Sequence, residues 1–424
     1  MNNTENKDII TFKKERWLHL SLFCIINFTT GALYVWSVFA DALAIRLSAI
    51  SSQTLVATDL GVIFGLATGI TPLMMLLGGF VNDRLGPKWM LTLGGILLLT
   101  GYTLTALVTH STSLYLTYGL LVGSGTGLVN GCTINSAVKF FPDRRGFASG
   151  LVTACLGIGA AILPFVARFL IDRFDICVTL LTFGWGSGLL ILICAFQTTK
   201  CPDTFANAFS QHKSNQPTHT VEMNWRQMIG SSLFIPLFIL FSTSATMGLM
   251  LLSNISSIAK TQIGLGSAMV ALSISAISLA NTSGRFISGV CSDLLGRLPT
   301  LIGSLIIALA GFGLLSIASL QDTLYYFTGI ICIGLCFGAF IGIYPSLVAD
   351  EFGAKNNSVN CSIMMFGYSV GGLVGPLLIQ WAHQGGNFTR AYFVCVCLAF
   401  LGIFCALLTM FLKRQQDRTH VSLS

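Results

Sequence analysis

Apolar runs long enough to cross a bilayer as helices follow one another along almost the whole chain, separated by short polar gaps. A bilayer core of about 30 Å needs about 20 helical residues at 1.5 Å each. Runs of that length lie at 17–40, 56–80, 90–109, 112–138, 147–171, 176–197, 231–256, 265–291, 299–319, 322–349, 357–381 and 388–412. The pattern therefore predicts an all-α membrane protein with twelve transmembrane helices.

One long hydrophilic stretch divides these runs six and six. It has no apolar periodicity, which is typical of a linker, and a short interfacial helix is expected around Trp225. We therefore expect an N-terminal six-helix half at residues 1–197, a cytoplasmic linker at 198–230 and a C-terminal six-helix half at 231–424.

Composition and charge agree with a lipid environment. Hydrophobic residues make up 54% and charged residues 9% of the chain, whereas a soluble domain carries roughly 25% charged residues. The net charge of +7 is spread over the polar gaps, so it does not indicate a nucleic-acid partner. Of the 23 lysines and arginines, seventeen lie on the side of the N-terminus and five on the opposite side. The positive-inside rule then predicts that both termini are cytoplasmic.

Residues that could carry chemistry are scarce in the spans. The thirteen cysteines lie almost all in apolar segments, without paired C-x-x-C motifs or a histidine cluster. We interpret them as inert packing residues and expect no metal ion. No span holds a cluster of His, Asp or Glu for acid–base chemistry. The sequence therefore favours a protein that is not an enzyme, with no catalytic residues and no cofactor.

A loop motif occurs once in each predicted half. Residues 79–88 read GFVNDRLGPK and residues 289–297 read GVCSDLLGR. Glycine allows close helix contact and tight turns, and an aspartate can cap a helix or pair with a basic residue. We expect a gating role for the motif residues Gly79, Asp83, Arg84, Gly86, Lys88, Asp293, Gly296 and Arg297. The two aspartates are 210 residues apart, about half the chain, and two related halves are typical of a rocking transporter.

The repeated motif resembles that of the major facilitator superfamily, and the resemblance covers nearly the whole chain. Two further stretches resemble the oxalate/formate antiporter family and, more distantly, the monocarboxylate transporters. They read NFTTGALYVWSVF at 27–39 and NSAVKFFPDRRGFASG at 135–150. We interpret Lys139, Arg144 and Arg145 in the second stretch as membrane anchors.

Arg285 is the ionisable residue that lies well inside a predicted span. It precedes Asp293 by eight residues, about 12 Å along a helix, and burying it unpaired costs at least ~2.5–3.5 kcal/mol. With Ser278, Asn281 and Ser288 it shares a helix face that we expect to line a cavity between the halves. Its planar guanidinium matches a carboxylate, and the family resemblance implies that this arginine binds the substrate's carboxylate. A bond from Arg285 to the carbonyls of a broken helix is the structural alternative.

Asn27 and Tyr34 share a face of the first span and, with Asn281 and Tyr368, are expected to shape the binding pocket. For Tyr34, simple packing is the alternative. The resemblance implies a lysine at the position of Tyr368 in oxalate carriers, and an aspartate at that of Asn281 in proton-linked monocarboxylate carriers. One arginine neutralises a monovalent anion better than a dianion, which favours formate, lactate or pyruvate over oxalate. The spans thus lack a buried carboxylate, which would be the obvious site for a coupling proton.

These features together predict a secondary active transporter of small carboxylate anions that works by alternating access and anion exchange. We expect a monomer, embedded in the lipid of a bacterial inner membrane. A proton-coupled monocarboxylate symporter and a carboxylate-sensing transceptor of the same fold remain alternatives. A sugar carrier is disfavoured, because it would need few fixed charges and Arg285 lies inside a span. A cationic-drug pump is disfavoured, because it would need a buried acid and none is evident in the spans.

Overall fold

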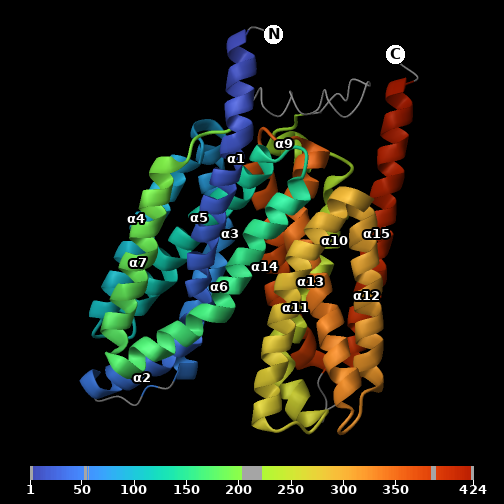
Figure 1. Cartoon of the computed structure of the whole chain (residues 1–424). Coiled ribbons are helices and arrows are strands. Elements are labelled where there is room, and N and C mark those ends of the chain that lie inside the picture. Colours follow the sequence, from blue (N-terminus) through green and yellow to red (C-terminus); the bar gives the residue numbers. More distant parts are fainter. Residues whose placement is uncertain (1–2, 52–54, 56, 203–221, 383–387, 422–424) are drawn as a thin grey trace. The chain divides into compact units, whose positions relative to one another are not determined.

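The computed structural model describes residues 3–51, 55, 57–202, 222–382 and 388–421, and these residues form helices without a strand (Figure 1). The first helices are α1 (Asn3–Thr30), η1 (Gly31–Val35), α2 (Trp36–Ser51), η2 (Ala57–Leu60), α3 (Gly61–Leu85), α4 (Pro87–Leu107), η3 (Tyr115–Val122), α5 (Gly123–Phe140), α6 (Arg145–Arg173) and α7 (Ile176–Gln197). The others are α9 (Trp225–Ile229), α10 (Phe234–Thr261), α11 (Ser267–Leu295), α12 (Arg297–Ile317), α13 (Thr323–Phe352), α14 (Asn357–Ala382) and α15 (Thr389–Val421). Residues 203–221 of the expected linker lie outside the described residues.

The contacts between residues divide the chain into two compact units. The first unit contains Met1–Ala148, Cys155–Thr220 and Ala354–Ser362, and the second contains Ser149–Ala154, Val221–Gly353 and Ile363–Ser424. Two helices therefore contribute residues to both units, since α6 supplies Ser149–Ala154 to the second and α14 supplies its first turns to the first.

In the first unit, α4 packs along α7 and α5, and α3 and α1 pack against α5. Figure 1 shows α4 and α7 side by side. Glycines make these contacts close, because a β-carbon on Gly125 would lie 2.9 Å from the carbonyl oxygen of Gly94, and one on Gly188 would lie 3.1 Å from that of Gly95. Small residues at such crossings are the usual solution for helices that associate in lipid.

In the second unit, α13 packs against α11 and α12, and α15 packs against α10 and α12. Two buried tyrosines of α13 tie that helix to α10. The hydroxyl of Tyr344 donates to the carbonyl oxygen of Leu237 at 2.6 Å, and that of Tyr326 donates to Ile255 at 3.3 Å. A buried hydroxyl needs such an acceptor, so these bonds fix how α13 lies on α10.

The second glycine of each loop motif makes a helix-to-helix turn. Gly86 joins α3 to α4 with φ +86°, and Gly296 joins α11 to α12 with φ +94°. Residues other than glycine rarely adopt this backbone conformation. The tight turns expected of the motif are therefore confirmed.

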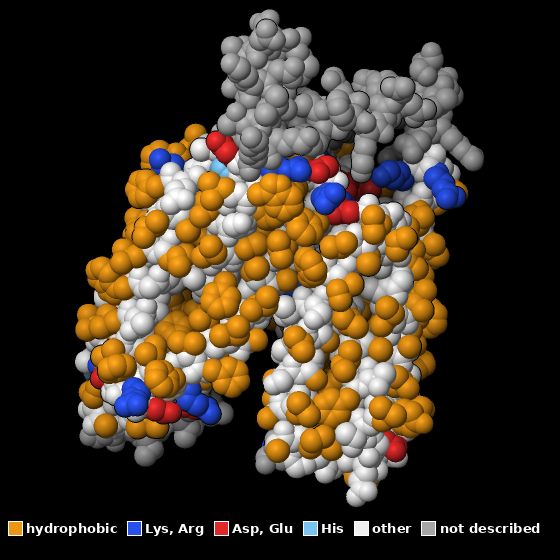
Figure 2. All heavy atoms as spheres, viewed as in Figure 1, with side chains coloured by type: hydrophobic (Ala, Val, Ile, Leu, Met, Phe, Trp, Pro, Cys, Tyr) orange, Lys and Arg blue, Asp and Glu red, His pale blue; other side chains and the backbone are white. Residues whose placement is uncertain are grey.

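Nine helical runs are long and apolar enough to cross a membrane among the described residues. Three further long helices, η3–α5, α11 and α14, are not among these nine, and each carries buried polar residues. Figure 2 shows hydrophobic side chains along the flanks of the helices, with the charged side chains gathered near helix ends. The first span is longer than predicted, Glu15–Ile50 instead of 17–40, because a 3₁₀ turn at Gly31–Val35 leads directly into α2.

Candidate functional site

Arg285 lies within α11, ten residues before the helix ends at Leu295, and is half-buried. Its Nε donates a hydrogen bond to Oδ1 of Asn281, one turn earlier, at 2.9 Å. Its Nη1 donates to the carbonyl oxygen of Thr153 in α6, also at 2.9 Å. Both acceptors are neutral, so these two bonds orient the guanidinium and add no opposite charge to it.

Glycines from two other helices enclose the backbone of Arg285. A β-carbon on Gly342 of α13 or on Gly150 of α6 would lie 2.5 Å from the carbonyl oxygen of Arg285. A β-carbon on Gly338 would lie 3.0 Å from the amide nitrogen of Arg285. Ser149 ties α6 to α13 here, because its hydroxyl donates to the carbonyl oxygen of Gly342 at 2.7 Å. Three helices therefore meet without intervening side chains at the position of the arginine.

The other residues proposed for this face of α11 differ in their bonding. The hydroxyl of Ser278 donates to Ile274 of its own helix at 2.8 Å, and that of Ser288 donates to Gly284. Tyr368 of α14 belongs to the same unit and stacks on Phe337 of α13, with ring centroids 6.1 Å apart and an interplanar angle of 19°. Asn281 is thus the residue of this face that bonds directly to the guanidinium.

Asn27 and Tyr34 belong to the first unit. Asn27 is fully buried, and its Nδ2 donates to Oγ1 of Thr133 in α5 at 2.5 Å. Thr30, one turn later, donates to Oδ1 of Asn130 at 2.7 Å, so a polar seam joins α1 to α5. Tyr34 lies in η1, is 41% exposed and makes an edge contact with Phe64.

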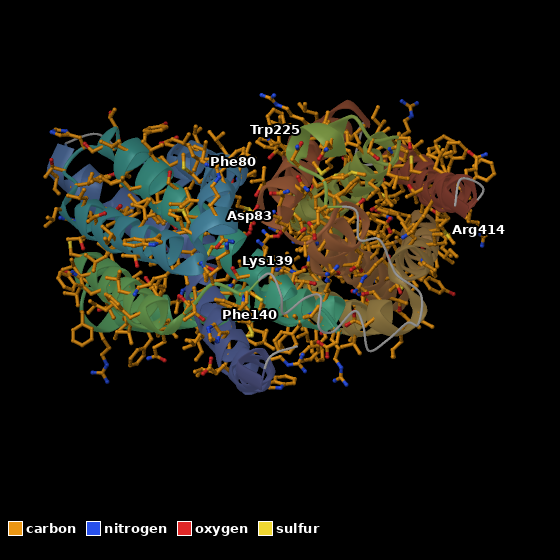
Figure 3. All side chains as sticks on the ribbon, turned by 90° about the horizontal axis from the view of Figure 1, so that it is seen from above. Phe80, Asp83, Lys139, Phe140, Trp225 and Arg414 are labelled. Carbon is orange, nitrogen blue, oxygen red and sulfur yellow. The ribbon has the colours of Figure 1, made fainter. Side chains whose placement is uncertain are left out.

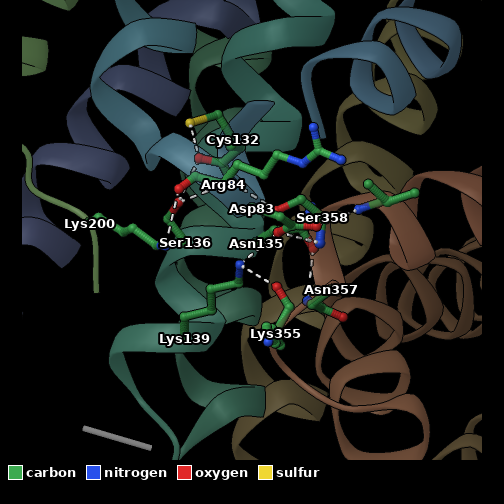
Figure 4. Close-up of polar contacts among 12 residues, drawn as sticks. Asp83, Arg84, Cys132, Asn135, Ser136, Lys139, Lys200, Lys355, Asn357 and Ser358 are labelled. Atoms are coloured by element: carbon green, nitrogen blue, oxygen red, sulfur yellow. Dashed lines mark hydrogen bonds and ion pairs between the residues drawn. The ribbon is translucent and has the colours of Figure 1, made fainter. Parts of the chain in front are cut away.

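The first copy of the loop motif joins α3 to the start of α14, inside the first unit. Oδ1 of Asp83 accepts from Nζ of Lys139 at 2.6 Å and from the amide nitrogen of Ser358 at 3.2 Å (Figure 4). Its Oδ2 accepts from the amide nitrogen of Val359, also at 3.2 Å. A carboxylate on the first free N–H groups of a helix is favourable, because these carry the positive end of the helix dipole. The backbone of Gly79 touches Ser358 at the same point.

Amide and hydroxyl side chains extend this contact. Nδ2 of Asn82 donates to Oγ of Ser358 at 2.8 Å, and Nδ2 of Asn357 donates to Oδ1 of Asn135 at 2.9 Å. Figure 3, a view from above, labels Asp83 of α3 and Lys139 of α5 close to one another, as their ion pair requires. The interpretation of Lys139 as a membrane anchor was wrong, since its ammonium group forms the ion pair with Asp83.

The remaining residues of this loop lie at its edge. Arg84 has an exposed side chain, and its carbonyl oxygen accepts from Nζ of Lys200 at 3.1 Å. The Nζ of Lys88 lies 5.3 Å from the ring centroid of Phe196 at the end of α7. Gly86 is covered by Lys200, because a β-carbon on it would lie 2.6 Å from Cβ of that lysine.

In the second copy of the motif, the basic residue and not the acidic one forms the ion pair with another helix. Arg297 pairs with Asp293 through Nη1 at 2.6 Å and with Asp350 at the end of α13 through Nε at 2.7 Å. Lys139 and Asp350 end α5 and α13, and their positions differ by 211 residues, close to the 210-residue repeat of the motif. In each half an ion pair therefore joins the motif loop to the end of the corresponding helix. The motif supplies the acidic residue in the first half and the basic residue in the second.

Several residues of these sites did not stand out in the sequence. Thr153 contributes a backbone carbonyl, which every residue has, and Gly342 is one among 44 glycines. The sequence did hold a signal for the partner of Asp83, because Lys139 and Asp350 occupy nearly the same position in the two repeats. Among the described residues, no group of three His, Cys, Asp or Glu is placed to hold a metal ion.

The fold and these two sites define a multi-pass membrane protein with a repeated loop network and a charged residue inside one helix. A model of the Major Facilitator Superfamily matches residues 17–376, and the chain belongs to this family of transporters. The family resemblance and the twelve-helix fold expected from the sequence are thereby confirmed.

Curated relatives and a solved structure agree with this family. The chain is 29% identical to an uncharacterized MFS-type transporter, YhjX of Escherichia coli, over 85% of its length and 87% of the relative's. It is 26% identical to the oxalate:formate antiporter of Oxalobacter formigenes, over 98% and 96%. It is 24% identical to monocarboxylate transporter 12 of the mouse, over 83% and 77%. The solved proton:xylose symporter XylE superposes with a TM-score of 0.69 at 14% identity, over 93% and 96%, which shows the shared fold.

Proposed function

We propose that this transporter carries small monovalent carboxylates such as formate, lactate or pyruvate, and that it exchanges one anion for another by alternating access. It is not an enzyme in this proposal. It acts as a monomer in a bacterial inner membrane, with both termini in the cytoplasm. The residues of the anion site are Arg285, Asn281, Tyr368, Tyr34 and Asn27, with Arg285 as the anchor.

The observation that carries the proposal is the arginine inside α11. Its guanidinium is half-buried and oriented by Asn281 and by the carbonyl of Thr153. A positioned guanidinium can bind a carboxylate through two parallel N–H···O bonds. Relatives that are named as an oxalate:formate antiporter and as monocarboxylate transporters support the same class of substrate.

Tyr368 favours a monovalent anion over a dianion. A dianion is best held by two cations, whereas Tyr368 supplies a neutral ring that is stacked on Phe337. Oxalate would then meet the charge of Arg285 without a second cation from this position. We therefore place formate, lactate and pyruvate before oxalate.

Asn281 favours exchange over proton symport. The side chain that bonds Nε of Arg285 is an amide, which takes up no proton at physiological pH. Binding of the anion therefore requires no proton at this position. A carrier that changes between its inward-facing and outward-facing states more readily with a bound anion exchanges internal for external anion.

The test is uptake of labelled formate, lactate, pyruvate and oxalate into proteoliposomes, with and without internal anion and with and without a proton gradient. Arg285→Gln removes the anchor charge, and Lys260→Gln is the matched control because Lys260 is exposed at the end of α10. We expect uptake of a monocarboxylate that internal anion stimulates, that Arg285→Gln abolishes and that Lys260→Gln leaves unchanged.

Each other outcome contradicts one part of the proposal. Uptake driven by the proton gradient alone would replace exchange by symport. Preferred uptake of oxalate would contradict the argument from Tyr368. Binding of a carboxylate without transport would favour a sensor with the same fold, and no interaction with any of the four anions would contradict the proposed substrate class.

A further inference from the structure

Two cysteines from distant parts of the sequence meet where α1 crosses α6 in the first unit. A β-carbon on Gly159 of α6 would overlap the carbonyl oxygen of Phe28, and one on Gly31 would lie 2.5 Å from the amide nitrogen of Ala160. Backbones that touch in this way leave no room for side chains at the crossing itself. The side chains one turn away are then the first that can meet.

Those side chains are thiols. Cys24 precedes Phe28 by four residues and Cys155 precedes Gly159 by four, so each shares a helix face with the residue at the crossing. The two thiols therefore lie next to one another, near enough for each to act on the charge of the other. Both cysteines are partly exposed. The sequence-based interpretation of these two cysteines as inert packing residues overlooked this pairing, since 131 residues separate them.

We propose that Cys24 and Cys155 form an oxidisable dithiol, which a hydroperoxide converts into a disulfide that ties α1 to α6. One thiol attacks a peroxide oxygen, the O–O bond breaks, and a sulfenic acid and one water form. The second thiol then attacks the sulfenic sulfur, the S–S bond forms, and a second water leaves. The two sulfurs together lose two electrons, which the peroxide takes up.

The position of the pair gives this disulfide a structural consequence. A disulfide needs its two Cα atoms within about 7 Å, and the glycine contact between the two helices lies only one turn from both cysteines. The bond would join α6 to the part of α1 just before the 3₁₀ turn Gly31–Val35. Hydrogen peroxide is small and neutral, so it can reach thiols within a bilayer.

The positions of the cysteines allow a clean test on the full-length protein in membranes. Cys24 is the only cysteine before Cys132 in the sequence, so any disulfide that links a fragment before residue 110 to the rest must involve Cys24. A protease site inserted beside His110, which is exposed between α4 and η3, produces these two fragments. Membranes are treated with hydrogen peroxide, free thiols are blocked, and the cleaved protein is run on a denaturing gel without reductant.

We expect the two fragments to migrate together after peroxide treatment and to separate when a reductant is added. Cys24→Ser and Cys155→Ser should each abolish the linkage, and Cys177→Ser, which removes another partly exposed cysteine, should leave it intact. Mass spectrometry of the linked wild-type peptides identifies the partner even if a serine variant fails to fold. Fragments that separate after peroxide treatment, or a linkage that survives Cys155→Ser, would overturn the proposal.

Discussion

Oδ1 of Asn281 lies 2.9 Å from Nε of Arg285, one helical turn away on α11, and accepts its hydrogen bond. The amide is an acceptor without charge, so it orients the guanidinium and does not compete with an anion for its positive charge. A carboxylate at the same place would do both. The difference between an amide and a carboxylate at position 281 is therefore the most direct probe of the anchor.

Asn281→Asp should weaken binding of the transported anion. The new carboxylate pairs with Arg285, and hydrogen bonds to charged groups contribute about 1.5–3 kcal/mol, which corresponds to roughly 10- to 100-fold in KM. The KM of the variant for formate, measured by exchange in proteoliposomes at neutral pH, should rise by this factor.

Asn254→Asp is the control for the added charge, because Asn254 lies on α10 and bonds to Met250 and Ser253. It should leave the KM within about twofold of the wild-type value, because the bonds of Asn254 stay within α10. A KM of Asn281→Asp that matches the KM of Asn254→Asp would mean that charge competition at Arg285 plays no part.

Gly342→Ala should displace the arginine without removing it. The added β-carbon would lie 2.5 Å from the carbonyl oxygen of Arg285, so α13 and α11 must move apart. Forced overpacking costs about 1–3 kcal/mol, and thermal unfolding in detergent should show a lower midpoint. We expect transport to fall further than the loss of folded protein explains, because the guanidinium moves with its backbone.

Gly303→Ala in α12 is the matched control, since a β-carbon there meets nothing within 4 Å. This variant should keep both its transport and its unfolding midpoint. If Gly342→Ala transports like Gly303→Ala at equal folded amounts, the close packing around Arg285 does not position the anchor.

The sequence was sufficient for the helices and for the arginine, because apolar length and a charge inside a span can be recognised locally. It could not predict what holds the arginine, since Thr153 lies 132 residues away and acts through its backbone. Lys139 shows the same limit, because a basic residue at a helix end suits lipid headgroups as well as it suits Asp83. Partners of this kind depend on which helices pack together, and no local pattern records that.

Asp83→Asn should destabilise the first unit through two losses at once. The variant loses the ion pair with Lys139, whose partner oxygen is 2.6 Å away, and it weakens the cap on the first amide groups of α14. The carboxylate side chain is only 6% exposed, and a capping residue alone contributes about 0.5–2 kcal/mol. Thermal unfolding in detergent should therefore show a clear decrease in the midpoint.

A double-mutant cycle separates the two losses. If Lys139→Met destabilises the wild-type protein but has little further effect in Asp83→Asn, the two side chains stabilise the fold as a pair. Lys200→Met serves as the control, because its ammonium group bonds only a carbonyl of the same loop among the contacts described. Effects of Asp83→Asn and Lys139→Met that simply add would contradict a stabilising ion pair.

Tyr368→Lys should shift the preference of the carrier from monocarboxylates toward oxalate. The substitution adds a second cation to the unit that contains Arg285, and two cations compensate a dianion better than one. We expect the ratio of oxalate to formate exchange, measured at equal concentrations in proteoliposomes, to rise by about tenfold, equivalent to roughly 1.4 kcal/mol. Tyr368→Phe keeps the ring that stacks on Phe337 and should leave the ratio unchanged. A lysine variant that still folds and exchanges formate, but with an unchanged ratio, would show that position 368 does not face the anion.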